Sequence, residues 1–212
     1  MSMFFGHNQG ESESLGYGYL YNRYAIIDAN FPPTDWEVPS ESDFDTLIAS
    51  AGGSGSGGNA LKEAGTNHWI AANGTNTTGF TGLGSGYRTF SGTFARITEY
   101  LNLWDTEGSS PNYMRIVGIS GSIAYQGALA AQGNSIRLLY TGAGTPTTVT
   151  DNDGNVYDVV LIGSQRWTVQ NWKCTTLSRS PFTALTKVTD SAAWAALTTE
   201  GYCAYDNDDN NV

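Results

Sequence analysis

Charged side chains are scarce in this chain, and positive ones are scarcer than negative ones. Only 14% of the 212 residues are Asp, Glu, Lys or Arg, and 20 acidic residues stand against 10 basic ones, for a formal charge of −10. A surface this acidic repels phosphate backbones and anionic lipid headgroups. We therefore expect no nucleic-acid partner and no membrane partner.

Long hydrophobic runs are missing as well. No apolar stretch approaches the roughly 20 residues that a membrane-spanning helix needs. Residues 1–10 also lack the basic start and the apolar run of a secretory signal. The sequence therefore predicts no membrane anchor and no export by the signal-peptide route, whereas assembly into a virion inside a host needs no signal.

Cysteine and histidine are too few for most metal and nucleophile chemistries. Cys174 and Cys203 are the two cysteines, and either one disulfide or two free buried thiols is consistent with them. No Cys/His set has zinc spacing, and His7 and His68 belong to no Ser/His/Asp arrangement with visible context. There is no nucleophile elbow and no phosphate loop. We expect a protein that is not an enzyme, with no cofactor and no metal.

Aromatic residues and glycine are plentiful. The chain has 12 Tyr, 8 Phe, 6 Trp and 26 Gly. The aromatic content supports a packed core and argues against global disorder. Many Gly, Ser, Thr and Asn with little charge are typical of a loop-rich extracellular or virion protein.

Two short helices have clear start signals. Ser40 and Asp43 form a capping box in front of an apolar stripe that contains Phe44 and Leu47. The glycine-rich run 52–58 ends this helix, and one further helical turn is expected over 59–64. Asp190 is expected to cap a second helix, centred on Trp194.

Strands are expected from alternating or aromatic segments bounded by turn residues. The predicted strands or extended segments are 16–27, 113–117, 122–125, 135–140, 155–162 and 166–173. Long ordered loops are expected over 67–86. Asp151 and Asp153 suggest a calcium loop, but an EF-hand needs Gly at the sixth position and Glu at the twelfth. Gly154 is fourth and Ile162 is twelfth, so a tight Asp-Gly turn is the better interpretation.

Nine short motifs are recognisable along the chain. Four follow residue 148: DNDGNVY (151–157), IGSQRW (162–167) with Asn171, VTDSAAW with LTT (188–199), and YCAY (202–205). Five precede it: YGYLYNRYA (17–25), WEVPSESDFDTL (36–47), LKEAGTNHW (61–69), GFTGLGSGYR (79–88) and GNSIR (133–137). Together they resemble the Fibrobacter succinogenes major paralogous domain family, with the four motifs after residue 148 matching the opening of that domain and the five motifs before it matching its remainder.

The order of these two groups is reversed relative to the family. The chain therefore resembles a circular permutant, in which residues 1–15 are an N-terminal arm and residues 16–212 one domain. Within it, 16–140 is the usual second half, 141–148 a linker and 149–212 the usual first half. Permutation is tolerated where termini lie close together on the surface. We expect 135–140 and 155–162 to be neighbours in one sheet; exchange of the tail between subunits is the alternative, and a homo-oligomer is compatible with it.

The resemblance implies an α+β, C-type-lectin-like fold with small twisted antiparallel sheets, two short helices and long ordered loops. Calcium-dependent sugar lectins use paired amide and carboxylate ligands beside a cis-proline, in motifs such as E-P-N, Q-P-D and W-N-D, and none of these is present. A related fold houses enzymes with a reactive cysteine pair, which Cys174 and Cys203 do not match. Lectin-like shape alone is no argument for sugar binding.

The family motifs fade between residues 88 and 133, and the resemblance implies that this stretch forms the exposed binding face. Aromatic, Arg and Asn side chains dominate recognition surfaces because they give large contact area at low entropy cost. The candidate ligand-binding residues are Phe90, Phe94, Arg96, Tyr100, Asn102, Tyr113, Arg115, Tyr125 and Gln126. Leu101, Leu103 and Trp104 are expected in the core, and Arg88 and Arg137 are expected to be structural hydrogen-bond donors.

The sequence thus favours a receptor-binding or adhesion module on a virion, such as a phage tail or fibre, or on a cell surface. Its expected partners are a cell-surface protein or glycan of a host and, through residues 1–15, other virion or surface subunits. A structural decoration or assembly protein with no ligand of its own is the alternative.

Overall fold

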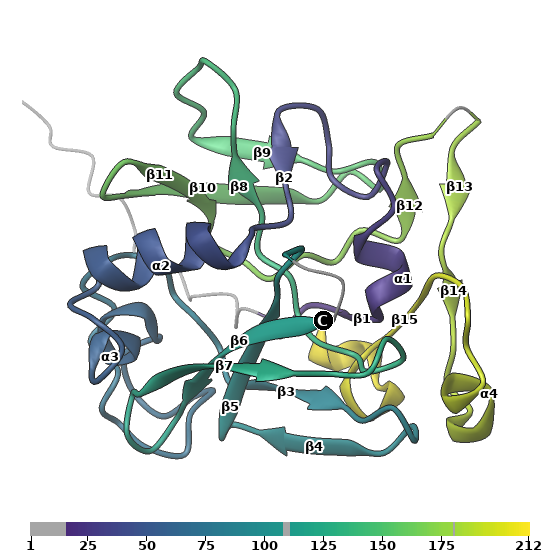
Figure 1. The fold of residues 1–212 in the computed structure, drawn as a ribbon, viewed down its shortest axis with the longest axis horizontal. Helices are drawn as coiled ribbons and strands as arrows, with labels where there is room; N and C mark the ends of the chain where they lie inside the picture. Colours follow the sequence, from purple (N-terminus) through teal and green to yellow (C-terminus); the bar gives the residue numbers. More distant parts are fainter. Residues whose placement is uncertain (1–15, 108–110, 180) are drawn as a thin grey trace, which may run out of the picture.

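The computed structural model describes residues 16–107, 111–179 and 181–212, and its main elements are two five-stranded sheets with a helix between them (Figure 1). The first sheet runs in the order β2 (Trp36–Glu37), β8 (Leu139–Tyr140), β11 (Gln165–Thr168), β10 (Val156–Ile162) and β9 (Thr148–Thr150). The second runs β4 (Phe94–Ile97), β3 (Ser85–Arg88), β5 (Tyr100–Trp104), β6 (Asn112–Val117) and β7 (Ile123–Gly127). The fold is α+β and rich in sheet. Among the described helices, none is long and apolar enough to cross a membrane.

Smaller elements complete the fold. A three-stranded sheet has the order β1 (Leu20–Tyr21), β15 (Gly201–Cys203) and β14 (Thr186–Lys187), and β12 (Thr176–Leu177) pairs with β13 (Thr183–Ala184). The helices are α1 (Arg23–Ile26), α2 (Glu41–Ser50), α3 (Gly57–Leu61), α4 (Ser191–Ala195) and the 3-10 turns η1 (Tyr205–Asn207) and η2 (Asp209–Asn211). The prediction of two short helices is therefore too low, and the sheets are not purely antiparallel, since β3–β5 and β14–β15 pair in parallel.

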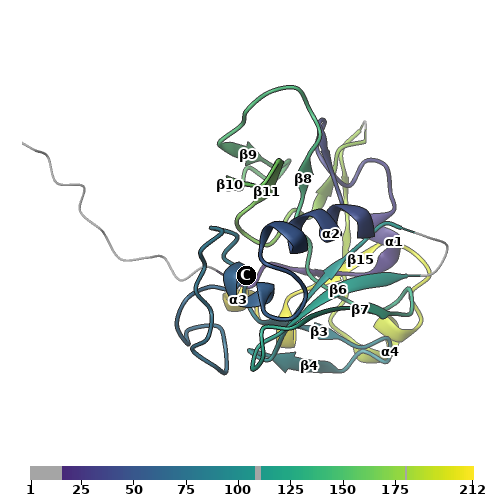
Figure 2. The same ribbon diagram turned by 60° about the vertical axis from the view of Figure 1, so that its left-hand side comes forward.

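Helix α2 lies between the two sheets, as the two views in Figures 1 and 2 both show. The predicted capping box is present: the Ser40 side chain accepts from the Asp43 backbone N–H, and the Asp43 side chain accepts from the Ser40 N–H. The apolar stripe turns inward, and the Phe44 ring stacks on Trp167 of the first sheet with centroids 5.5 Å apart. The local start signal and the apolar stripe together explain why the sequence forms this helix here.

The N-terminal aromatic segment is not the single strand that its alternation suggested. Only Leu20–Tyr21 is strand, and α1 follows at once because Asn22 is an N-cap whose side chain accepts from the Ala25 N–H at 3.1 Å. The same Asn22 also donates to Thr199 O at 2.9 Å. A capping Asn therefore overrides the aromatic pattern.

The predicted neighbours 135–140 and 155–162 do share a sheet, but they do not pair with each other. Strand β11 lies between them, with Trp167 opposite Leu139 and Val160 opposite Trp167 on its other side. The hairpin β10–β11 turns at Gly163, which has φ +60°. The second strand of this hairpin, β11, therefore lies against β8, and β10 lies one strand further away. The expectation of direct pairing is wrong in this detail.

Residues on both sides of the 141–148 segment contribute to the same buried clusters. One cluster combines Tyr21, Trp36 and Trp104 with Tyr157 and Trp172. Leu101, Leu103 and Trp104 are completely buried, as predicted. The two parts of the chain thus bury apolar surface against each other.

Two buried arginines join these parts. Arg137 donates to Asn171 Oδ1 at 2.6 Å, to Phe80 O at 2.8 Å and to Thr168 O at 2.9 Å. Arg88 lies between the rings of Phe94 and Trp194, at 4.7 and 4.5 Å from their centroids. It donates to the carbonyl oxygens of residues 92, 188 and 189. Both are structural hydrogen-bond donors, which confirms the prediction.

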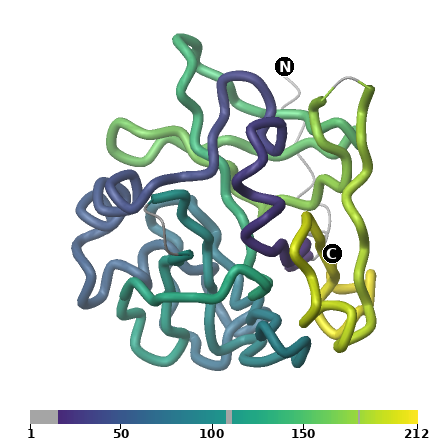
Figure 3. Tube along the Cα trace, turned by 45° about the vertical axis from the view of Figure 1, so that its right-hand side comes forward, coloured from purple at the N-terminus to yellow at the C-terminus, as the bar shows by residue number. Residues whose placement is uncertain are grey.

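The end of the described chain lies beside its beginning. The backbone N–H of Tyr17 donates to Asn211 O at 2.7 Å, and Figure 3 shows the yellow C-terminal segment next to the first purple residues. Gly16 is so close to Val212 that an added Cβ would lie 2.1 Å from the Val212 carbonyl carbon. Residues 16–17 and 211–212 are therefore in direct contact.

Candidate functional site

The second sheet has two chemically different faces. Successive residues of a strand point to opposite sides, and directly paired residues of antiparallel strands point to the same side. Leu101 and Leu103 of β5, Met114 and Ile116 of β6 and Ile123 of β7 fill the core on the α2 side. The residues between them, including Tyr100 and Asn102, Tyr113 and Arg115, and Gln126, are therefore on the other side.

Arg115 is the centre of this second face. Its guanidinium lies 4.2 Å from the ring centroid of Tyr100, 5.3 Å from that of Tyr113 and 5.7 Å from that of Tyr87. These distances are within the range of cation–π attraction. The register between β5 and β6 positions this guanidinium, because Arg115 of β6 lies directly opposite Asn102 of β5.

Hydrogen bonds fix the orientation of Arg115. Its Nε donates to Asn102 Oδ1 at 3.0 Å and its Nη2 donates to Tyr113 Oη at 2.8 Å. Asn102 is itself held by Asn134, to which it donates at 3.3 Å. Nη1 makes no hydrogen bond to the described residues, and it is not among their buried atoms that lack a partner. No carboxylate of the described chain lies within ion-pair distance of Arg115.

Two more predicted residues border this cluster. Arg96 is exposed, lies 5.7 Å from the Tyr100 ring and pairs with Glu99 at 2.8 Å. Gln126 is exposed and lies opposite Tyr113 on β7. We name the whole set the Arg115 face, which consists of Tyr87, Arg96, Tyr100, Asn102, Tyr113, Arg115 and Gln126.

Exposure within the Arg115 face differs from expectation at two positions. Asn102 is completely buried and Tyr113 is 5% exposed, because the adjoining segment around Asn134 and the aromatic core cover this end of the sheet. These two side chains are hydrogen-bond partners of Arg115. Because they are buried, a ligand cannot contact them directly. Arg115, Tyr100 and Tyr87 are half-buried, whereas Arg96 and Gln126 are exposed.

Three predicted residues lie elsewhere. Tyr125 points to the core side, where its hydroxyl donates to Asp45 Oδ1 at 2.8 Å and to Glu41 O at 3.0 Å, and burial raises its pKa. Phe94 packs against Tyr205 with centroids 5.3 Å apart. Phe90 is 53% exposed in the turn between β3 and β4. The sequence Ile-Ala-Tyr-Gln over 123–126 could have predicted this, because residues two apart in a strand point to the same side and Ile123 is apolar.

Tyr87 is the member that the sequence reasoning missed. It lies in a recognised family motif (79–88) and was therefore excluded from the fading stretch that follows. Tyr87 lies two residues from Ser85 in β3, so both side chains lie on the same side of the sheet. The structure shows which side this is, because the Ser85 hydroxyl bonds to Ser135 at 2.7 Å.

The predicted Asp-Gly turn is present, and its carboxylates are satisfied by the protein. Asp151 accepts from the backbone N–H groups of Asp153 and Asn155, both at 2.9 Å, and from Tyr157 Oη at 2.7 Å. Asp153 accepts from the hydroxyl of Thr175 at 2.9 Å. Ligand atoms of Asp151, Asp153 and Cys174 lie close enough to hold a metal ion. The Asp151 carboxylate is already used by the turn, and the Asp153 carboxylate is already used by Thr175.

The two cysteines are free and buried, which resolves the alternatives left by the sequence. Cys174 belongs to the aromatic cluster of Tyr21 and Trp36, and Cys203 to a separate cluster with Trp194. Burial raises the pKa of each thiol to about 12. Neither thiol is therefore prepared for nucleophilic chemistry at neutral pH.

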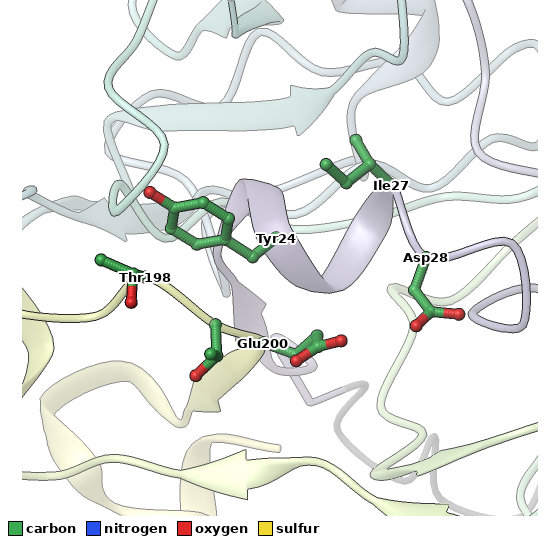
Figure 4. Close-up of a pocket in the computed structure, with 6 residues that line it drawn as sticks. Tyr24, Ile27, Asp28, Thr198 and Glu200 are labelled. Atoms are coloured by element: carbon green, nitrogen blue, oxygen red, sulfur yellow. The ribbon is translucent and has the colours of Figure 1, made fainter.

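An open pocket of about 320 Å³ lies between α1 and the segment before β15 (Figure 4). Its lining residues are Tyr24, Ile27, Asp28, Thr198, Thr199 and Glu200. The Arg179 guanidinium joins its two carboxylates, at 3.0 Å from Asp28 and 3.3 Å from Glu200. Its charged groups are therefore paired with one another, which makes it a weaker candidate than the Arg115 face.

Comparison with known proteins assigns the family of this sheet-rich α+β fold. The model of the Fibrobacter succinogenes major domain matches residues 4–139, more than half of the chain, and the chain belongs to that family. The matched region contains every residue of the Arg115 face. No curated protein and no solved structure gives a significant match.

Proposed function

We propose that the protein is a non-catalytic receptor-binding or adhesion module, displayed on a virion or cell surface, which holds its ligand on the Arg115 face. The single observation that carries the proposal is Arg115, a half-buried guanidinium that is fixed by Asn102 and Tyr113 and surrounded by tyrosine rings. Among the described residues it has no acidic partner, and its Nη1 has no hydrogen-bond partner. Arg and Tyr in such partly desolvated positions are the residues that most often carry binding energy.

The rest of the molecule supports this function as a rigid scaffold. The Arg115 face is built on paired strands, and its supporting residues are buried on a sheet whose reverse side is core. A site on strands holds its geometry better than a site on loops. The partner bound there is a cell-surface protein or glycan of a host.

We also propose that the fold is C-type-lectin-like and circularly permuted relative to the family. Support comes from the reversed motif order and from the contact between residues 17 and 211 at 2.7 Å, where the family's halves would be continuous. Expression of 149–212 followed directly by 16–140 tests this. A soluble monomer with the same cooperative unfolding and near-UV spectrum is expected, and an unfolded product contradicts the permutation.

The functional test is adhesion to a panel of bacterial cells, Bacteroidetes included, by fluorescently labelled protein. Arg115→Met should lower bound fluorescence at least tenfold on any strain that the wild type binds, since loss of a charge-assisted contact costs about 2 kcal/mol or more. Arg166→Met on β11 of the other sheet is the matched control and should bind as the wild type does. Equal adhesion of all three proteins removes the assignment, and lattice assembly without adhesion to any strain favours a decoration protein instead.

A further inference from the structure

The charge distribution of the chain restricts what the Arg115 face can bind. All ten basic side chains lie in the described residues. Three pair with carboxylates, namely Arg96, Arg179 and Lys187. Four are buried and donate to carbonyl or amide oxygen atoms, namely Arg23, Lys62, Arg88 and Arg137. Of the remaining three, which are Arg115, Arg166 and Lys173, Arg115 alone lies against aromatic rings.

From this we infer that the ligand is a glycan with a single terminal carboxylate, a sialic or uronic acid, that Arg115 binds without calcium. The inference rests on the proposed function and names its ligand class. A positive charge fixed in place and partly removed from water attracts one anionic group strongly, because its orientation needs no further ordering.

The geometry of Arg115 suits a carboxylate. Nε is used by Asn102, and Nη2 gives one of its two hydrogens to Tyr113. Both hydrogens of Nη1 and the second hydrogen of Nη2 have no acceptor among the described residues, and a carboxylate accepts such parallel N–H groups in a bidentate arrangement. The neighbouring Arg96 adds little attraction, because Glu99 neutralises it at 2.8 Å.

The surroundings of Arg115 suit a sugar ring better than an acidic peptide. The phenol groups of Tyr87 and Tyr100 and the exposed amide of Gln126 are uncharged groups that can exchange hydrogen bonds with sugar hydroxyls. A peptide with several carboxylates would meet one unpaired cation here and the repulsion of a chain with formal charge −10 elsewhere. A ligand with one isolated carboxylate has no such penalty.

The experiment uses immobilised 3′-sialyllactose and a glucuronate-terminated disaccharide, each with its neutral methyl ester, and the full chain in calcium-free buffer with EDTA. Surface plasmon resonance should show binding to at least one acid, at least tenfold weaker binding to its ester, and weakening between 50 and 300 mM salt. Comparison of the two acids distinguishes the sialic from the uronic source. Arg115→Met should lose the binding, and Arg166→Met should keep it.

Each failure has a separate meaning. Equal binding of acid and ester, or binding of an Asp/Glu-rich control peptide instead of either sugar, overturns the inference. Binding that requires calcium also overturns it. If neither sugar binds while adhesion to cells still depends on Arg115, the ligand class is wrong and the proposed function stands; if adhesion does not depend on Arg115 either, both fail. Melting temperatures of each variant within about 3 °C of the wild type show that folding is not the cause.

Discussion

Replacement of Arg137 by Met should destabilise the protein more than any surface change. Its guanidinium is 1% exposed and makes four hydrogen bonds, to Asn171 Oδ1, Phe80 O, Thr168 O and Thr81 O, at 2.6 to 3.0 Å. It also lies 4.7 Å from the centre of the Phe80 ring. Burial lowers the pKa of this guanidinium, so keeping it charged has a cost that the four acceptors offset.

Methionine keeps the volume of the aliphatic stem but removes every donor. Each buried acceptor left without a partner costs about 1–3 kcal/mol. Removal of the buried charge returns part of that cost, and such contributions are not additive. We therefore expect the free energy of unfolding to fall by about 3–5 kcal/mol, because up to four buried oxygen acceptors lose their donor.

The assay is equilibrium urea unfolding at pH 7, followed by fluorescence of the six tryptophans. A shift of the midpoint with an unchanged m-value is expected, because Arg137 joins the 79–82 loop to β11 and its loss leaves one shared core. Arg166 is half-buried on β11, and Arg166→Met should change the free energy of unfolding by less than about 0.5 kcal/mol. A loss below 1 kcal/mol for Arg137→Met, or two separate transitions, would refute the reasoning that both parts depend on this residue.

Three further changes follow from the same structure. Asp105 is completely buried, one of its carboxylate oxygens has no partner among the described residues, and burial raises its pKa from 3.8 to about 6. Because the folded state holds this proton more tightly, the contribution of Asp105 to stability is present below pH 3.8 and lost as the pH rises through 6. Asp105→Asn should therefore gain up to about 3 kcal/mol at pH 7.5, with the gain shrinking toward pH 4 in urea titrations; no pH dependence of the difference contradicts this. Ser40→Ala removes the α2 capping box and should lower the free energy of unfolding by about 1 kcal/mol, with Ser42→Ala, whose hydroxyl is exposed, as control. Cys174 and Cys203, buried with pKa values near 12, should resist iodoacetamide at pH 7.5 and both be alkylated in 8 M urea; rapid labelling of the native protein, measured by mass spectrometry, disproves their burial.

Local signals made part of this fold predictable. The capping box at Ser40 and Asp43 predicted α2, the N-cap at Asp190 predicted α4, and the alternating run after the Asp-Gly turn predicted β10. Each is a short-range preference that the tertiary structure leaves in place. The segment 17–27 failed because one capping side chain, Asn22, outweighed an aromatic pattern.

The residue types of the candidate site could be predicted from the sequence, but the side of the sheet to which each side chain points could not. Arg115, Tyr100 and Arg96 were chosen because they are the right residue types, and the structure brings them together. The burial of Asn102 depends on Asn134, which is 32 residues away in the chain, and no local pattern contains that contact. The register that separates Tyr125 from Gln126 also depends on pairing between strands, since a shift of one residue would exchange the two faces.

Site-specific photo-crosslinking locates the receptor contact most directly. A benzophenone side chain at position 126, exposed at the edge of the Arg115 face, is compared with one at position 161, exposed on the other sheet. After irradiation on cells that the wild type binds, position 126 should yield covalent adducts with a surface component, and Arg115→Met in the same chain should abolish them. Equal adducts from position 161, or none from position 126 on cells that retain the protein, would place recognition on a different surface.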